Sequence, residues 1–246
     1  MPTPPPHRDL ALRLLPLLDL TSLGEDDTSQ QITALCAAAL SAHPTPAAVC
    51  VYPEHVTTAR QALAKSPVRV ATVVNFPDGD GRPVRVQRET RRALAAGAEE
   101  IDLVFDYRAF LRGDVALARD GVVACREACG NEVPLKLILE TGMLAEARLI
   151  RDASRIGIDA GADFLKTSTG KVAVNATLLA AAAMLDAIEA TGGRCGLKVS
   201  GGIRTLDDAA PYLALVDACM GADWATPRHF RIGASALFPA LLATLQ

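Results

Sequence analysis

The sequence lacks the features that direct a protein to nucleic acid or into a membrane. It contains no run of Lys or Arg and carries a net charge of -3, so it offers no basic field for a polyanion. Its longest apolar run, Leu178 to Leu185, is far shorter than the roughly 18 residues that a membrane span needs. Arg13, Pro16 and Asp19 interrupt the apolar start, and no signal-peptide cleavage site follows. We therefore expect a soluble, cytoplasmic protein that binds a small molecule rather than nucleic acid or a membrane.

Histidine is scarce and the cysteines are scattered. None of the four histidines lies two to five residues from another, so the sequence shows no local pair of metal ligands. The six cysteines show no CxxC spacing, and a chain of this length without an export signal does not need disulfides. We expect reduced thiols.

The composition predicts one globular domain. Half of the 246 residues are hydrophobic, which is enough for one sizeable core, and nothing in the sequence suggests a linker. We interpret residues 1–9 as a flexible proline-rich tail and residues 10–246 as the domain. The sequence leaves the oligomeric state open, and a homo-oligomer is compatible with it.

Eight strand-like segments alternate with helical segments along the chain. One helix is predicted between an N-cap at Asp114 and a C-cap at Gly130. The spacing is roughly thirty residues, the size of a βα unit, and eight such units predict an α/β fold of the (β/α)8 TIM-barrel type rather than an open sheet. The predicted strands cover residues 14–20, 47–52, 68–76, 100–105, 134–140, 163–169, 194–200 and 230–235.

Three of these apolar strands carry a lysine near their middle. Lys136, Lys166 and Lys198 stand in the fifth, sixth and seventh strands, and Asp102 stands in the fourth. Any one lysine could belong to a structural ion pair or reach out of the barrel. Three together suggest chemistry, because a lysine close to another cation loses its proton more easily and becomes a nucleophile that can form an imine.

Glycine-containing turns follow the last three strands. Backbone amides at such turns and at helix N-termini can bind phosphate, and the ends of strands seven and eight are the usual place for this in a barrel. Thr205 and Asp208 resemble a capping pair that opens a helix behind one of these turns. The candidate residues are Gly170, Lys171, Gly201, Gly202, Gly233 and Ser235.

The segments "LDLTSL", "EIDLVFDYRAF", "KLILETG", "LKTSTGKVAVNAT" and "LKVSGGIRT" together resemble deoxyribose-phosphate aldolase, from about residue 10 to residue 245. The resemblance implies a metal-independent class I aldolase without a cofactor. It also implies a reversible cleavage of 2-deoxy-D-ribose 5-phosphate to acetaldehyde and D-glyceraldehyde 3-phosphate, in deoxynucleoside catabolism.

The same resemblance implies a role for each polar residue of the strands. Lys166 would form the Schiff base, Lys198 would tune it or relay a proton, and Asp102 would donate or accept protons. Asp19 and Lys136 would support this network. Thr169 falls on the substrate and phosphate loops together with the glycine-turn residues named above.

Two positions depart from the family pattern. Ala236 stands where close relatives often have a second serine, which removes one hydroxyl from the expected phosphate site. The chain ends at Gln246 without the longer tyrosine-ended tail of some members, so we expect no proton transfer by such a tail.

Several alternatives remain open from the sequence. The chain could be a sugar-phosphate isomerase or another Schiff-base aldolase on the same fold, or a barrel that binds sugar phosphates without turnover. Cys50 in the second strand is expected near the mouth of the barrel. Its thiol could attack an unsaturated aldehyde, or it could be a buried, inert cysteine.

Overall fold

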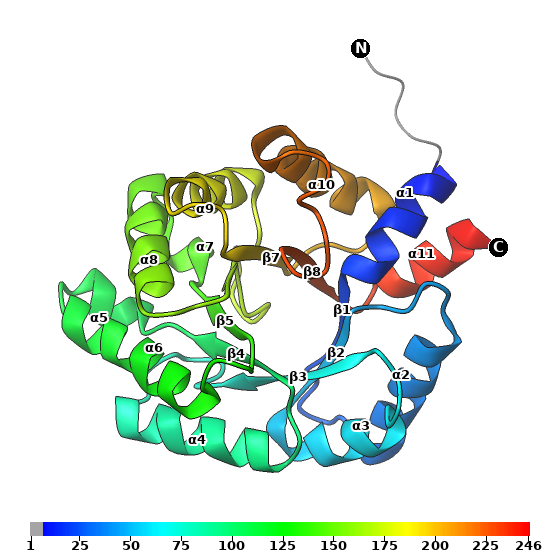
Figure 1. Cartoon of the computed structure of the whole chain (residues 1–246), viewed down its shortest axis with the longest axis horizontal. Coiled ribbons are helices and arrows are strands. Elements are labelled where there is room, and N and C mark those ends of the chain that lie inside the picture. Colours follow the sequence, from blue (N-terminus) through cyan, green and yellow to red (C-terminus); the bar gives the residue numbers. More distant parts are fainter. Residues whose placement is uncertain (1–6) are drawn as a thin grey trace.

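The computed structural model describes residues 7–246 as a closed barrel of eight parallel strands in the order β1 to β8. Figure 1 shows the strands as a central ring with the helices arranged around it. This confirms the predicted (β/α)8 barrel. The strands are β1 (Leu18–Ser22), β2 (Ala48–Val51), β3 (Arg69–Val74), β4 (Glu100–Val104), β5 (Leu135–Ile138), β6 (Phe164–Lys166), β7 (Gly196–Ser200) and β8 (Phe230–Ala234).

Helices connect the strands and cover the outside of the barrel. Short 3-10 turns lie at Leu15–Leu17 and Pro53–His55. Within residues 7–246, none of the helices combines the length and the apolar character that crossing a bilayer requires. The helices are α1 (His7–Leu14), α2 (Ser29–Ser41), α3 (Val56–Ala62), α4 (Pro83–Ala95), α5 (Tyr107–Leu111), α6 (Val115–Cys129), α7 (Thr141–Leu144), α8 (Ala147–Asp159), α9 (Leu178–Ala190), α10 (Leu206–Met220) and α11 (Leu237–Leu245).

The start of the domain differs from the prediction. Residues 1–6 of the expected tail lie outside the described residues, but residues 7–9 form the first turn of α1, with Asp9 at its favourable N-terminal end. The first strand was predicted to begin at Leu14 and instead begins at Leu18. Pro16 accounts for this delay, because its fixed φ suits the intervening 3-10 turn and it has no N–H to donate to a sheet.

Local signals in the sequence place several helix ends correctly. The Asp114 side chain accepts a hydrogen bond from the backbone N–H of Leu117, and α6 ends at Gly130. Thr205 and Asp208 form a capping box at the start of α10. Gly97 and Gly161, each followed by an alanine and an acidic residue, come just after α4 and α8 with φ of 105° and 97°. That conformation suits glycine and closes the helix before the next strand.

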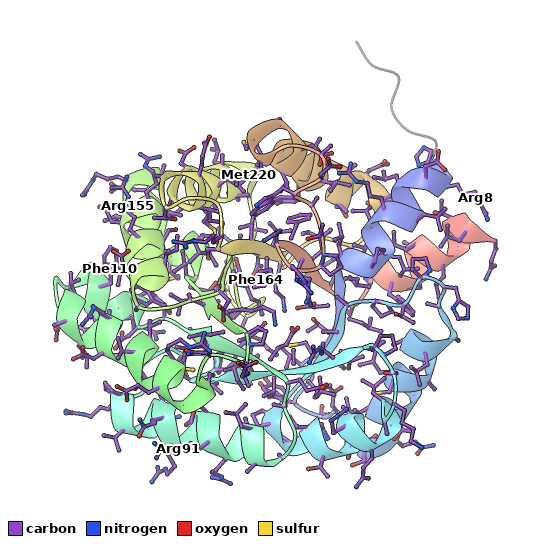
Figure 2. The ribbon with its side chains drawn as sticks, viewed as in Figure 1. Arg8, Arg91, Phe110, Arg155, Phe164 and Met220 are labelled. Atoms are coloured by element: carbon purple, nitrogen blue, oxygen red, sulfur yellow. The ribbon has the colours of Figure 1, made fainter. Side chains whose placement is uncertain are left out.

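Side chains alternate between the barrel lumen and the layer under the helices. On β2, Val49 and Val51 join the main core, whereas Ala48 and Cys50 form a second small cluster with Ala71 and Val73 of β3. Figure 2 shows Phe164 of β6 inside the ring of strands, while the labelled arginines lie on the periphery. The lumen therefore has an apolar side at β2 and β3, and the remaining strands supply polar side chains.

Helix α8 approaches the barrel closely because it has a glycine at the contact. A Cβ at Gly157 would lie 2.4 Å from Leu137 Cδ2 and 3.4 Å from Leu165 Cδ2, and both leucines are buried. Leu137 cannot move aside without disturbing the packed layer around it. Gly121 in α6 offers a matched comparison, since a Cβ there meets nothing within 4 Å.

We predict that Gly157→Ala lowers the free energy of unfolding by about 1–3 kcal/mol, because it overpacks the layer between α8 and the barrel. Gly121→Ala should raise it by about 0.5–1 kcal/mol, because alanine loses less backbone entropy in a helix. Urea unfolding monitored by circular dichroism measures both. Equal effects of the two substitutions would contradict the close approach of α8.

Candidate active site

The three mid-strand lysines and Asp102 meet in the lumen. In the sheet register, Lys166 of β6 is the neighbour of Lys198 of β7, and Asp102 of β4 is the neighbour of Lys136 of β5. All four side chains are almost fully buried. The structure therefore brings together the residues that the sequence placed on four separate strands.

Asp102 is the centre of this cluster. Its Oδ2 accepts hydrogen bonds of 2.8 Å from both Lys166 Nζ and Lys198 Nζ, and its Oδ1 accepts one of 2.9 Å from Lys136 Nζ. Three ammonium positions thus surround one carboxylate. Charge-assisted contacts of this kind fix the geometry of the lysine side chains.

Further charged residues extend the cluster toward the end of the barrel at which the strands begin. Lys198 Nζ lies 2.6 Å from Asp19 Oδ2 in an ion pair outside hydrogen-bond geometry. Lys136 Nζ lies 2.6 Å from Glu100 Oε2 and 3.7 Å from Asp19 Oδ2. Arg231 joins Asp19 and Glu100 through contacts of 2.5 and 3.1 Å. Asp19 and Lys136 therefore lie in contact with the other charged residues of the lumen.

Burial and neighbouring charges move the pKa values of the two central lysines in opposite directions. For Lys166, burial is the largest influence and lowers the pKa, Asp102 opposes it, and repulsion from Lys198 reinforces it. For Lys198, burial also acts to lower the pKa, but attraction to Asp102 and Asp19 outweighs it and raises the pKa well above its ordinary value. Lys166 is thus the lysine that becomes a neutral amine more easily. The sequence had suggested repulsion as the cause, and the structure adds burial as the larger one.

The carboxyl group of Asp102 stays ionised at rest. Burial acts to raise its pKa, but Lys136, Lys166 and Lys198 together hold it well below its usual range. Asp102 is therefore a negative charge beside Lys166.

A cavity of about 420 Å³ opens at the C-terminal end of the barrel. Of the seven charged residues of the lumen cluster, Lys166 alone lines it. The others lie beneath. The lining residues are Thr21, Ser22, Leu23, Gly24, Asp27, Lys166, Thr169, Gly170, Lys171, Ser200, Gly201, Gly202, Ile203, Arg204, Gly233, Ala234, Ser235 and Ala236.

The predicted phosphate loops form one side of this cavity. Gly201 and Gly202 after β7 have φ of 88° and 84°, and a Cβ at Gly201 would lie 2.6 Å from the Asn175 side chain. Ser235 is exposed immediately before α11, so the cavity also borders a helix N-terminus. Lys171 Nζ donates a 2.8 Å hydrogen bond to the carbonyl of Leu23, which also lines the cavity.

Gly233 has a different structural role from the other glycines. It lies within β8, and a Cβ there would lie 3.0 Å from Lys198 Cε and 3.0 Å from Ser200 Cβ. The missing side chain therefore gives Lys198 room in the lumen, in addition to leaving Gly233 at the wall of the cavity.

Glu140 is a site residue that the sequence analysis missed. Its side chain is buried after β5 and accepts a 2.5 Å hydrogen bond from Thr169 Oγ1. Burial raises the pKa of Glu140 despite this bond. Its φ of 55° is unusual for a residue with a side chain. Glu140 thereby holds Thr169 at the loop that follows Lys166.

Arg204, Glu100 and Arg231 were also missed. Arg204 lines the cavity and stands in the "SGGIRT" segment that was singled out. Glu100 and Arg231 had readable signals: Glu100 precedes Asp102 by two residues and so shares its face, and Arg231 interrupts an apolar strand as the lysines do.

Cys50 lies in the lumen rather than at an exposed mouth. Its side chain is fully buried, and burial raises the pKa of its thiol although Lys198 opposes this shift. The reactive thiolate is therefore disfavoured, which supports the inert alternative. All six cysteines are unpaired, and five of them are buried.

The arrangement of Lys166, Asp102 and the cavity suits the attack of an amine on a carbonyl group. An amine that is easily neutral, next to a fixed carboxylate and open to a cavity, can attack a carbonyl carbon. Within residues 7–246, no three His, Cys, Asp or Glu side chains converge in a way that would hold a metal ion.

Comparison with known proteins assigns the family. The profile of the DeoC/LacD family aldolases matches residues 13–236. The chain resembles the apo crystal structure of a provisionally assigned deoxyribose-phosphate aldolase from Toxoplasma gondii ME49, with 27% identity, a TM-score of 0.89, and coverage of 97% of this chain and 96% of that one.

Two further structures share the fold. A provisionally assigned deoxyribose-phosphate aldolase from Coccidioides immitis is 29% identical, with a TM-score of 0.85 and coverage of 100% of this chain and 89% of that one. A tetrameric deoxyribose phosphate aldolase from Aeropyrum pernix is 22% identical, with a TM-score of 0.75 and coverage of 98% of both chains. With a lysine–aspartate lumen beneath an open cavity and a family match over nearly its whole length, the chain belongs to the DeoC/LacD family of aldolases.

Proposed function

We propose that this aldolase cleaves 2-deoxy-D-ribose 5-phosphate reversibly to acetaldehyde and D-glyceraldehyde 3-phosphate through a Schiff base on Lys166, as a step of deoxynucleoside catabolism. One observation carries the proposal: Lys166 lines the cavity, and burial lowers its pKa. The provisional assignments of the Toxoplasma and Coccidioides proteins support the choice of substrate.

The first steps form the imine. The neutral amine of Lys166 adds to C1 of the open-chain sugar, and the carbinolamine takes up one proton from solvent in the open cavity as it loses water, which leaves a protonated imine. Asp102 Oδ2, 2.8 Å from the nitrogen in the free protein, stabilises this cation.

Carbon–carbon cleavage follows with a single mobile proton. The 3-hydroxyl loses its proton to Asp102, the C2–C3 bond breaks, and its electron pair moves into the iminium group. This releases glyceraldehyde 3-phosphate and leaves a neutral enamine on Lys166. Since the nitrogen loses its charge as Asp102 gains the proton, the net charge of the lumen stays constant.

The same proton completes the cycle. The iminium charge beside Asp102 is gone in the enamine, so the pKa of Asp102 is higher than in the iminium state and Asp102 can give the proton to C2 of the enamine. Water then hydrolyses the iminium group, which frees acetaldehyde and neutral Lys166 and returns to solvent the proton taken up when the imine formed. Lys198 remains charged throughout, because its contacts with Asp19 and Asp102 favour its ammonium form.

The phosphate is placed by the loops that border the cavity. Gly201, Gly202 and the N-terminus of α11 offer backbone amides, and Lys171 and Arg204 contribute positive charge. Ser235 adds a hydroxyl. This arrangement separates the charged end of the sugar from the reacting aldehyde at Lys166.

We predict that borohydride with acetaldehyde reduces an imine on Lys166 and adds a two-carbon label that peptide mass mapping locates. Lys166→Met should abolish both this label and the release of glyceraldehyde 3-phosphate in a coupled dehydrogenase assay. Lys65, an exposed residue in the turn after α3, is the matched control, and Lys65→Met should leave both signals unchanged. A label found only on other lysines, or no label, would show that the assignment of Lys166 is wrong. No label together with no release of glyceraldehyde 3-phosphate would favour a barrel that binds sugar phosphate without turnover.

A second prediction concerns the phosphate loops. Ser235→Asp places a negative charge against the substrate phosphate, so KM for deoxyribose 5-phosphate should rise about tenfold or more, with little change for unphosphorylated deoxyribose. Ala236→Ser adds a hydroxyl at an exposed neighbouring position and should lower KM for the phosphorylated sugar only. Equal changes in KM for the two sugars would contradict the proposal that the phosphate binds at this position.

A third prediction follows from the opposite pKa shifts. The rate of imine trapping should rise with pH as Lys166 loses its proton. Lys198→Met removes a cation and raises the pKa of Lys166, which moves the profile to higher pH. Asp102→Asn removes an anion and moves it to lower pH, while slowing cleavage by about 10²–10⁴-fold because the proton acceptor is lost. If both variants lose stability but keep the parent profile per folded molecule, the cluster is only structural.

A further inference from the structure

Arg231 and Glu100 lie at the end of the lumen opposite the open cavity. Glu100 begins β4 and Arg231 is the second residue of β8, where it is the register neighbour of Lys198. Both line a second cavity of about 620 Å³, together with Phe164 and a set of prolines. Phe164 stands inside the ring of strands in Figure 2, and its ring centroid lies 5.7 Å from Arg231 Cζ.

The hydrogen-bonding groups of this pair point into the charged cluster. The Arg231 guanidinium contacts Asp19 Oδ1 at 2.5 Å and Glu100 Oε1 at 3.1 Å, and its Nε donates to the carbonyl of Pro227. The other oxygen of Glu100 lies 2.6 Å from Lys136 Nζ. Arg231 and Glu100 therefore reach Lys166 only through intermediate residues.

The cluster contains unequal numbers of cations and anions. Four cationic side chains (Lys136, Lys166, Lys198 and Arg231) and three carboxylates (Asp19, Glu100 and Asp102) are joined by ion contacts and buried together. A surplus charge in a buried site is costly, and a proton is the easiest charge to remove. Arginine does not lose its proton in proteins, so relief of the surplus by proton loss falls to a lysine.

The contacts identify which lysine loses its proton. Lys136 contacts three carboxylates, and Lys198 contacts two. Lys166 contacts only Asp102 and shares the same oxygen with Lys198. Lys166 is therefore the least compensated cation of the cluster.

We propose that Arg231 and Glu100 are positioning residues that set the charge surplus of the lumen, and that the surplus is relieved by loss of the Lys166 proton. Arg231 supplies the fourth cation, and Glu100 fixes it in place and limits the surplus to one charge. This inference rests on the proposed imine chemistry at Lys166, and it adds control of that amine by residues that never contact it.

Other charged or titratable groups lie near Lys166. Cys50 reaches the lumen from β2, and burial raises the pKa of its thiol, so it adds no negative charge. Glu140 follows β5 and bonds to Thr169; it has no ion contact with the cluster, but attraction to Lys166 acts to lower its pKa. Asp27, Lys171 and Arg204 line the same cavity as Lys166. All of these groups are the same in every variant below, so the comparison isolates Arg231 and Glu100.

The test is the pH profile of borohydride trapping by acetaldehyde, measured per folded molecule. Arg231→Met removes the surplus and should raise the midpoint of the Lys166 profile by about one unit. Glu100→Gln increases the surplus and should lower the midpoint. The double variant E100Q/R231M restores the surplus to one and should return the midpoint toward the parent value. Arg231→Lys keeps the charge but loses the planar fork, and should also stay near the parent value.

The variants separate charge from folding. Loss of the Arg231 contacts will lower stability, so the urea midpoint is measured for each protein. If Arg231→Met and Arg231→Lys shift the profile equally, or if neither shifts it while both lose stability, the pair is structural and the proposal is wrong. Opposite shifts for the two single variants, cancelled in the double variant, support it.

A second readout distinguishes this proposal from the proposed function. Lysine labelled with ¹³C at Cε, assigned through Lys166→Met, reports the pKa of Lys166 by NMR without any substrate. If the parent protein shows no imine, the proposed function fails. The same NMR titration of Arg231→Met and Glu100→Gln still decides whether the charge surplus acts on Lys166.

Discussion

The barrel lumen must hold seven charged side chains with little water. Charges buried in this way are tolerated when each has partners, and here the numbers of cations and carboxylates do not match. Lys166, the residue that we propose to react, has the fewest carboxylate contacts in the network and also lines the cavity. On this proposal its reactivity arises from the whole cluster rather than from a single neighbour.

The second requirement is space. The charged strands surround an interior that is apolar at β2 and β3, where Ala48, Cys50, Ala71 and Val73 pack together. Small side chains and Gly233 make room for the long side chains of the lysines. The apolar side also keeps the local dielectric constant low, which strengthens every ion contact across the lumen.

Much of this architecture could be predicted from the sequence, because strand and helix signals are local. The eight strands, the cap at Asp114 and the mid-strand lysines are all visible in short segments. The convergence of the lysines on Asp102 followed from the rule that alternate residues of barrel strands face inward. Arg231 and Glu100 obeyed the same rule and were overlooked, although Arg231 interrupts an apolar strand as the lysines do. Three features depend on distances across the fold that a sequence pattern does not contain. They are the relative effects of burial and repulsion on the pKa of Lys166, the space that Gly233 leaves for Lys198, and the hydrogen bond between Glu140 and Thr169.

The division of the lumen into two sides has a consequence for how this protein can change over generations. On the apolar side, one residue can be exchanged for another of similar volume without regard to the rest. On the charged side, a single exchange alters the electrostatic state of every member, so tolerated changes must come as compensating pairs of opposite sign. Substitutions at β2 and β3 can therefore be accepted one at a time, whereas substitutions of the charged residues on the other strands must occur in pairs. We therefore expect substitutions in the charged half to be epistatic, because each of them alters the charge balance that acts on Lys166.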